Sequence, residues 1–167
     1  MRLPDEPASG LCVRNLRYGY GEVPVLDNVD LDVAPCASGV LIGPSGSGKS
    51  TLLHLIGGLL RVQSGSVQVG RERLETLSEA ELDAFRAQHV GVVFQQAHLA
   101  HALTVRQNVL LAPFAARREA DPKRADAILS RVGLGGLGDR LPHKLSVGQR
   151  QRVAIARAVM NGPTLLL

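Results

Sequence analysis

The sequence has 167 residues, of which 45% are hydrophobic, and carries a net charge of +4; such a chain can bury one core of ordinary size as a single globular unit. Its arginines are dispersed, and it contains three Phe, two Tyr and no Trp, so no nucleic-acid partner is expected. Two cysteines are too few for a disulfide framework.

No segment for export or membrane crossing is expected. Residues 1–10 contain two prolines and two acidic residues, whereas a secretory leader requires a continuous apolar stretch at this place. The most apolar window, residues 52–60, is too short to span a bilayer and is interrupted by His54.

The first third of the chain is predicted to be mainly β-structure. Residues 11–33 form short strands interrupted at the turn-rich residues 18–21, and three apolar residues near the end alternate with Asp30 and Asp32. This alternation is typical of a half-exposed strand in an antiparallel sheet.

A buried strand is then predicted to lead through a glycine-rich loop into a helix. Residues 39–42 are a short apolar run, residues 50–58 favour a helix, and residues 67–69 favour a further strand.

The second half is predicted to be largely helical. Capping-box patterns start helices at Ser78 and Thr104, and Asp121 with Pro122 starts another whose apolar residues recur at helical spacing. Residues 90–94 favour a second buried strand.

These elements predict an α/β fold in one domain, residues 1–167, with a helical insertion at residues 96–146. Residues 164–167 begin an apolar strand that stops at the last residue. We therefore expect a domain that is incomplete at its C-terminus, and poor solubility for the isolated chain, because an interrupted sheet exposes strand edges.

A glycine-rich loop provides the first functional motif. The P-loop pattern is matched by Gly43, Pro44, Ser45, Gly46, Ser47, Gly48, Lys49 and Ser50. The loop follows an apolar run and opens a helix, so its amides and the helix N-terminus predict a phosphate site. Lys49 would reach the β- and γ-phosphates, and the Ser50 hydroxyl would bind Mg²⁺. Thr51 is either a phosphate-supporting residue or a packed helix residue.

A second motif narrows the family. Residues 145–152 read LSVGQRQR and are followed by VAIARA, which resembles the signature of ABC transporter ATPases. The resemblance implies that Ser146, Gly148 and Gln149 face the γ-phosphate of ATP held by a partner subunit. Val147 departs from the family, which has a second glycine at this position. A plain capping box from Ser146 to Gln149 is an alternative that is compatible with this role.

Two further positions follow from the same resemblance. Tyr20 stands where the family has an aromatic residue that stacks on adenine, with Tyr18 as the competing candidate. Gln95 stands where the family has a glutamine that contacts magnesium or the attacking water, although Gln96 leaves the register open.

The remaining cysteine and histidine side chains indicate no metal site. These residues do not have the spacing of a set of metal ligands: Cys12, Cys36, His54, His89, His98, His101 and His143.

The resemblance implies a P-loop NTPase core of ABC ATPase type, with an N-terminal antiparallel β part and a helical subdomain. Family members hydrolyse ATP with Mg²⁺ as dimers, homodimers or paired ATPase subunits, on integral membrane permease subunits at the cytoplasmic face of the inner membrane. The magnesium-supporting aspartate and the general-base glutamate of the family would follow Leu167, so the 167-residue chain is expected to be nearly inactive.

Within the family, the helix after the P-loop is most similar to the branch for lipoprotein release and macrolide export. Two alternatives stay open: an ATPase switch that controls envelope or cell-division machinery, and a nucleotide-binding module without catalysis. The transported substrate and its direction are not encoded in these motifs.

Overall fold

The computed structural model describes residues 10–167, which belong to two compact units, Met1–Leu82 and Asp83–Leu167. The segment in which an export signal was sought lies almost wholly outside the described residues. Between residues 10 and 167, no helix is both long and apolar enough to cross a membrane.

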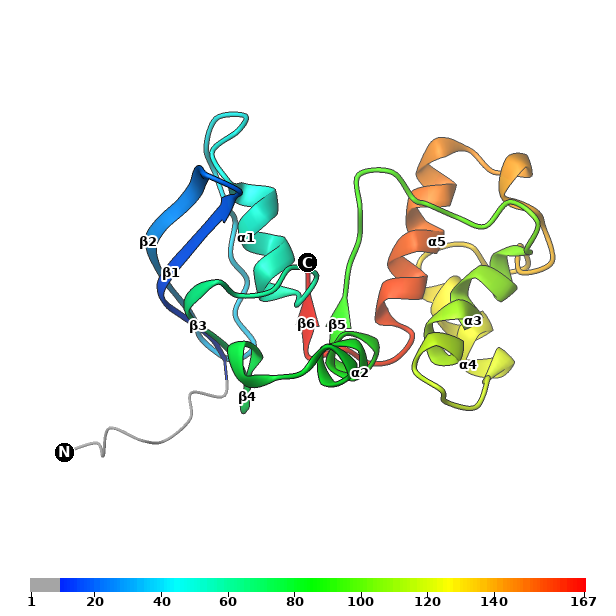
Figure 1. Ribbon diagram of the computed structural model, residues 1–167. Coiled ribbons are helices and arrows are strands. Elements are labelled where there is room, and N and C mark those ends of the chain that lie inside the picture. The colour runs from blue at the N-terminus through cyan, green and yellow to red at the C-terminus, as the bar shows by residue number, and fades with distance from the viewer. Residues whose placement is uncertain (1–9) are drawn as a thin grey trace. The chain divides into compact units, whose positions relative to one another are not determined.

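The first unit contains a four-stranded antiparallel sheet with one helix against it (Figure 1). Its strands are β1 (Leu11–Tyr20), β2 (Val23–Val33), β3 (Ser64–Val69) and β4 (Glu72–Arg73), in the order β2-β1-β3-β4. The helix is α1 (Lys49–Ile56), and a 3₁₀ turn, η1, spans Leu74–Thr76. The core is formed by Val13, Leu16, Leu55, Ile56 and Val67, each at most 1% exposed.

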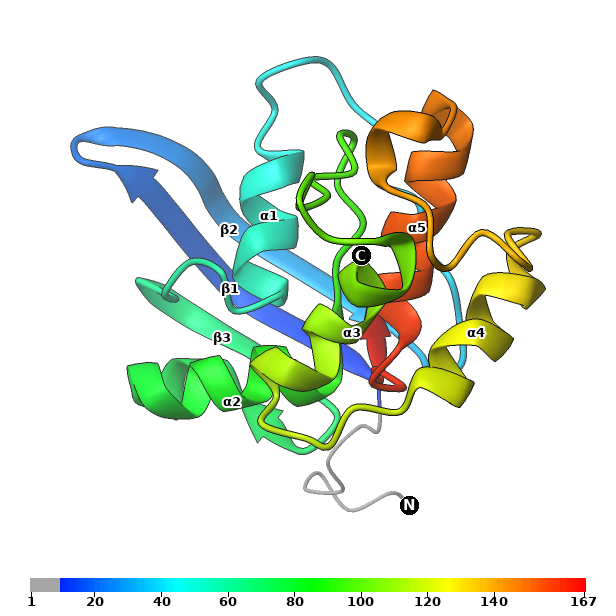
Figure 2. The ribbon, with the colours of Figure 1, turned by 90° about the vertical axis from the view of Figure 1, so that its right-hand side faces the viewer.

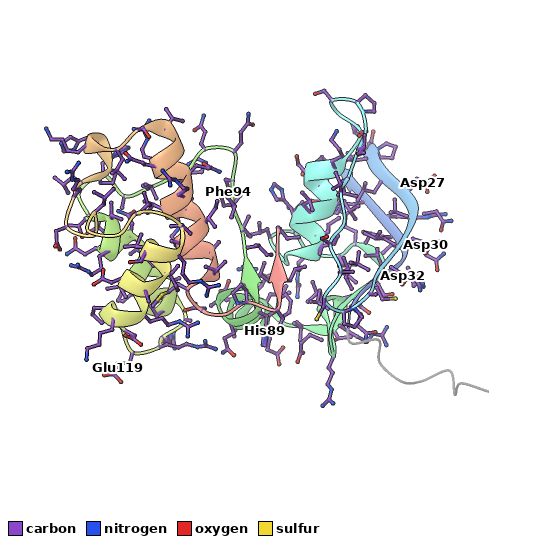
Figure 3. All side chains as sticks on the ribbon, turned by 180° about the vertical axis from the view of Figure 1, so that it is seen from behind. Asp27, Asp30, Asp32, His89, Phe94 and Glu119 are labelled. Carbon is purple, nitrogen blue, oxygen red and sulfur yellow. The ribbon has the colours of Figure 1, made fainter. Side chains whose placement is uncertain are left out.

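The predicted alternation in β2 is confirmed. Its acidic side chains Asp27, Asp30 and Asp32 are exposed and point away from the core (Figure 3), and partners on β1 stabilise them. Arg14 contacts Asp32 at 2.7 Å, and the amide of Asn15 donates to Asp30 at 2.8 Å. The turn is narrower than predicted, because β1 continues to Tyr20 and only Gly21 and Glu22 form it.

The predicted buried strand at residues 39–42 is wrong. This segment has no strand geometry, and Val40 and Ile42 are 83% and 91% exposed. A strand requires a neighbouring ladder to satisfy its main-chain groups, and within residues 10–167 no strand pairs with this segment. The apolar run therefore remains unpaired within these residues and open to solvent.

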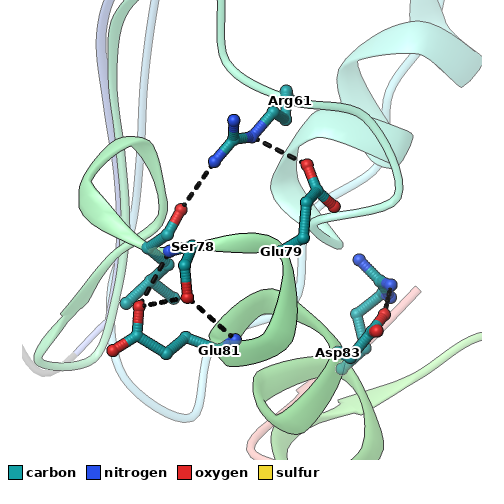
Figure 4. A network of polar contacts seen from close by, with 7 residues as sticks. Arg61, Ser78, Glu79, Glu81 and Asp83 are labelled. Atoms are coloured by element: carbon teal, nitrogen blue, oxygen red, sulfur yellow. Dashed lines mark hydrogen bonds and ion pairs between the residues drawn. The ribbon is translucent and has the colours of Figure 1, made fainter.

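Helix α2 (Glu79–His89) begins with the predicted capping box. The Ser78 amide donates to the Glu81 carboxylate at 2.8 Å, and the Glu81 amide returns a bond to the Ser78 hydroxyl at 3.4 Å (Figure 4). Arg61 adds a bond to the Leu77 carbonyl and an ion pair with Glu79. These contacts fix the start of α2 relative to the segment that follows α1.

The second unit is a helical cluster with a small parallel sheet. Its helices α3 (Val105–Ala115), α4 (Pro122–Arg131) and α5 (Val147–Val159) gather on one core (Figure 2), and η2 spans Pro142–Lys144. That core contains Leu99, Val105, Val109, Ala125, Leu129, Leu134, Leu145, Val153, Ala156 and Met160. The predicted caps at Thr104 and Asp121 are both present.

The second predicted strand, residues 90–94, is shorter than expected. Only β5 (Val90–Gly91) pairs in parallel with β6 (Leu165–Leu166). Further backbone bonds run from the Val93 amide to the Leu167 carbonyl, from the Leu167 amide to the Gly91 carbonyl and from the Thr164 amide to the His89 carbonyl. The chain then leaves the ladder at Phe94, so the glutamine pair that follows lies in a loop.

Candidate functional site

The glycine-rich loop ends in a left-handed turn that starts α1. Gly46 and Gly48 both have φ +82°, a conformation that glycine adopts without a steric cost. A Cβ on Gly48 would lie 2.8 Å from the Leu26 side chain and 3.1 Å from the Val25 carbonyl oxygen, whereas one on Gly46 would meet nothing within 4 Å. The left-handed backbone conformation thus favours glycine at both positions, and close packing excludes a side chain at Gly48 as well.

The Lys49 ammonium lies over its own loop. It donates to the carbonyl oxygens of Gly43 at 3.0 Å and Pro44 at 2.6 Å, and it lies 3.3 Å from the Ser47 hydroxyl. The side chain therefore curls back across residues 43–48. A cation held there adds positive charge beside the loop and favours an anionic ligand.

The N-terminus of α1 is open to an anionic ligand. Gly48 caps it without a side-chain hydrogen bond, and its first turn has no acidic residue. The first intrahelical bond runs from the Leu52 amide to the Gly48 carbonyl, so the amides of the three preceding residues point beyond the helix end. Ser50 is exposed at this end, while Thr51 is 8% exposed and packs within the unit. This arrangement fits a phosphate chain.

The two tyrosines near the β1–β2 turn form one aromatic pair. Their rings are 5.2 Å apart in an edge-to-face arrangement, and Tyr20 is 53% exposed. A hollow of about 380 Å³ beside the turn is lined by Tyr18, not by Tyr20. Gln63 also lines the hollow, and its side chain bonds both the amide and the carbonyl of Gly19, although no sequence motif marks this residue.

Gln95 lies in the loop that follows β5, and both Gln95 and Gln96 are exposed. The loop contacts α5, because Gln151 Nε2 of the side chain donates to the Phe94 carbonyl at 2.9 Å. Arg157 donates to the carbonyls of Ala97 and His98. Neither contact has a recognisable sequence motif, since each ends on a main-chain oxygen.

The signature segment forms the start of α5. Ser146 is the N-cap: its hydroxyl accepts from the Gln149 amide at 3.2 Å, and the Gln149 side chain accepts from the Ser146 amide at 2.9 Å. Val147 is 75% exposed in the first turn, and a Cβ on Gly148 would meet no atom within 4 Å. The capping box is therefore present, and the tip of the helix is uncrowded.

The predicted site residues fall into two groups, one in each unit. The first unit holds Tyr20 and residues 43–51. The second holds Gln95, Ser146, Gly148 and Gln149, joined through α5. Over residues 10–167 no group of three or more Cys, His, Asp or Glu side chains could hold a metal ion.

The sequence is similar to curated ATP-binding proteins. A family profile described as ABC transporter matches residues 26–167. The lipoprotein-releasing system ATP-binding protein LolD of Chromohalobacter salexigens is 43% identical over 157 residues, 92% of this chain and 66% of that protein. The macrolide export ATP-binding/permease protein MacB of Rhodopirellula baltica is 42% identical, over 92% of this chain and 23% of that protein. The chain thus spans less than two thirds of the length of these relatives.

The fold is similar to that of a solved cassette. The dimeric structure of MJ0796, a bacterial ABC transporter cassette, matches with a TM-score of 0.82 and 36% identity, covering 93% of this chain and 72% of that chain. A post-hydrolysis state of MJ0796 bound to ADP and Pi matches with a TM-score of 0.83. The predicted α/β cassette fold, with an antiparallel β part and a helical part, is confirmed, and this chain covers part of it.

Proposed function

The chain belongs to the ABC transporter family of ATP-binding proteins, and from this premise we propose that residues 43–51 bind the triphosphate of ATP. The observation that carries the proposal is the open N-terminus of α1 behind two left-handed glycines, with the Lys49 ammonium over the loop. Such a cradle supplies several amide donors and one cation to a single anion. Residues 43–50 would hold the phosphates, with Thr51 supporting them from within the helix.

Magnesium would bind between the nucleotide and two oxygen donors of this chain. Ser50 Oγ is exposed at the helix start, and Gln95 is exposed in a loop whose ends are fixed to α5. Hydroxyl and amide oxygens are ligands that Mg²⁺ accepts alongside phosphate oxygens. When bound, the ion supplies charge neutralisation for phosphoryl transfer.

We assign ATP hydrolysis to the full-length protein, acting as a homodimer or with a paired ATPase subunit. Each P-loop would bind an ATP that the signature of the other subunit covers, through Ser146, Gly148 and Gln149. The open space at Gly148 supports this role, because a Cβ added there would meet no atom within 4 Å. We propose that residues 1–167 alone hydrolyse ATP very slowly, because the position of the family's general-base glutamate would follow Leu167. A general base contributes about 10²- to 10⁴-fold to a rate.

The energy would drive a membrane-spanning permease at the cytoplasmic face of the inner membrane. The lipoprotein release and the macrolide export in the names of LolD and MacB support a transport function over a switch function. We further propose that residues 1–167 belong to a single ATPase domain with its helical insertion at residues 96–146, which contains α3 and α4.

Calorimetry and turnover assays on the full-length protein test this function. The wild type is expected to bind Mg-ATP and hydrolyse it, and Lys49→Ala is expected to bind it more weakly and to lose turnover. Equal turnover by wild type and variant would overturn the proposal. Purification from membranes separates the roles, since a permease partner supports transport and a division-site partner supports the switch.

A further inference from the structure

The loop at residues 94–98 is held at both ends by one helix. Gln151 Nε2 donates to the Phe94 carbonyl at 2.9 Å. Arg157 Nη2 and Nη1 donate to the Ala97 and His98 carbonyls, each at 2.9 Å. Gln95 and Gln96 lie between these anchors, and they are exposed.

Two further features close the same loop. The rings of Phe94 and His98 contact each other edge to face at 5.7 Å, which brings the loop ends together. His98 adopts φ +43°, a left-handed conformation unusual for a side chain other than glycine. A conformation of this kind persists only when surrounding contacts determine it, and the Arg157 bond to its carbonyl is such a contact.

Arg157 is the stronger of the two anchors. Burial lowers the pKa of its guanidinium, although an arginine remains charged in proteins. Within the described part of the chain its hydrogen-bond partners are carbonyls and it has no ion pair. A partly desolvated cation is costly unless its donors are satisfied, so moving the loop away from Arg157 is unfavourable.

The helix that carries these anchors also carries the signature at its start. Helix α5 runs from Val147 to Val159 without interruption and is capped by Ser146. A continuous helix fixes the positions of its side chains relative to its own N-terminus. The Gln95 loop is therefore linked to the signature tip through the body of one helix.

We propose that Gln151 and Arg157 are positioning residues that fix Gln95 to the signature helix, so that the loop and the helix move as one body. The inference rests on the proposed function, because it assigns to the pair a role in ATP turnover. Any partner that displaces residues 94–98 would then displace the signature tip with them.

The test uses Gln151→Ala and Arg157→Lys in the full-length protein, with Arg124→Lys as the matched control. Arg124 also donates to a main-chain carbonyl of the second unit, that of Met160, but this contact is far along the sequence from the Gln95 loop. Both test variants are expected to lower kcat about threefold to tenfold, the effect of losing one or two hydrogen bonds. KM for ATP should stay unchanged in both test variants. The thermal midpoint of Gln151→Ala should equal that of the wild type, and the Arg124→Lys control should keep wild-type kcat.

A double-mutant cycle separates positioning from general damage. In a protein that already carries Gln95→Ala, adding Gln151→Ala should lower kcat by less than about twofold. A residue that acts only through Gln95 has no further effect once the Gln95 side chain is removed. Full multiplication of the two single effects would overturn the inference.

Backbone relaxation measured by NMR provides a readout that needs no turnover. Residues 95–98 should have lower order parameters in both test variants, with those of α5 unchanged. Unchanged order parameters in this loop overturn the inference even if activity falls. Absence of ATP turnover by the wild type would count against the proposed function, while the relaxation result would still decide whether the anchors hold the loop.

Discussion

The ammonium of Lys49 lies 2.6 Å from the carbonyl oxygen of Pro44, five residues earlier in the same loop. This bond closes the glycine-rich loop over the start of α1. A bound triphosphate would offer the ammonium stronger, anionic acceptors than a neutral carbonyl. The lysine would therefore exchange a contact within the loop for one with the ligand.

Lys49→Ala is expected to weaken Mg-ATP binding at least about tenfold, since a hydrogen bond to a charged group is worth about 1.5–3 kcal/mol. Calorimetric titration of the full-length protein measures this change. Lys123→Ala removes the same charge from the exposed surface of α4, so it should bind ATP like the wild type. Equal weakening by both variants would indicate an effect of net charge.

The two left-handed glycines predict unequal effects of alanine. Gly46→Ala should cost about 1–2 kcal/mol, the strain of a side chain in this conformation. Gly48→Ala should cost more, because its Cβ would also lie 2.8 Å from the Leu26 side chain. Denaturant unfolding of the two variants compares these costs directly. The packing argument is contradicted if Gly46→Ala is the more destabilised.

The sequence predicts the elements whose signals are local. The caps at Ser78, Thr104 and Ser146 lie where short polar side chains precede helices, and each forms the expected bonds. The alternation in β2 is equally local, because one side of the strand packs on the core. These features depend on residues within one turn or one strand, so the pattern contains the necessary information.

The sequence does not predict elements that depend on distant partners. Residues 39–42 have the composition of a buried strand, yet no ladder forms among the described residues, and Ile42 is 91% exposed. Asn108 has no distinctive pattern, but it is fully buried and its side chain bonds main-chain groups at Ala100, Leu103 and Thr104. Contacts of this kind end on backbone atoms, which every residue type presents alike.

Acidification is expected to weaken the start of α2. Hydrogen bonds from the Ser78 hydroxyl and amide hold the pKa of the Glu81 carboxyl below its ordinary value of 4.5. A depressed pKa contributes stability above the unfolded value, which is lost as the pH falls through the folded value. In Glu81→Gln this part of the pH dependence should vanish. Thermal midpoints at pH about 6 and about 3 measure it, and an unchanged slope would contradict the assignment.

Val147 is expected to limit the approach of a partner's nucleotide to the tip of α5. Its side chain is 75% exposed in the first helical turn, so removing it should change folding stability by only about 0.5 kcal/mol. ATP-dependent dimerisation should tighten from wild type to Val147→Ala and again to Val147→Gly. Sedimentation with ATP in a hydrolysis-deficient background measures the series. A series that runs in the opposite order would show that the branched side chain favours the contact.

Ser146 and Thr104 form equivalent capping boxes on α5 and α3, which separates a structural role from a functional one. Ser146→Ala and Thr104→Ala should each cost about 1 kcal/mol of stability, the usual effect of losing such a cap. Only Ser146→Ala should also lower kcat, by about tenfold, if its hydroxyl or the neighbouring amides face the γ-phosphate. Unfolding and turnover are measured on the same full-length variants, so the two variants can be compared at an equal loss of stability. Equal turnover losses in the two variants would mean that helix capping alone explains the serine, and the signature would then lose its proposed contact with ATP.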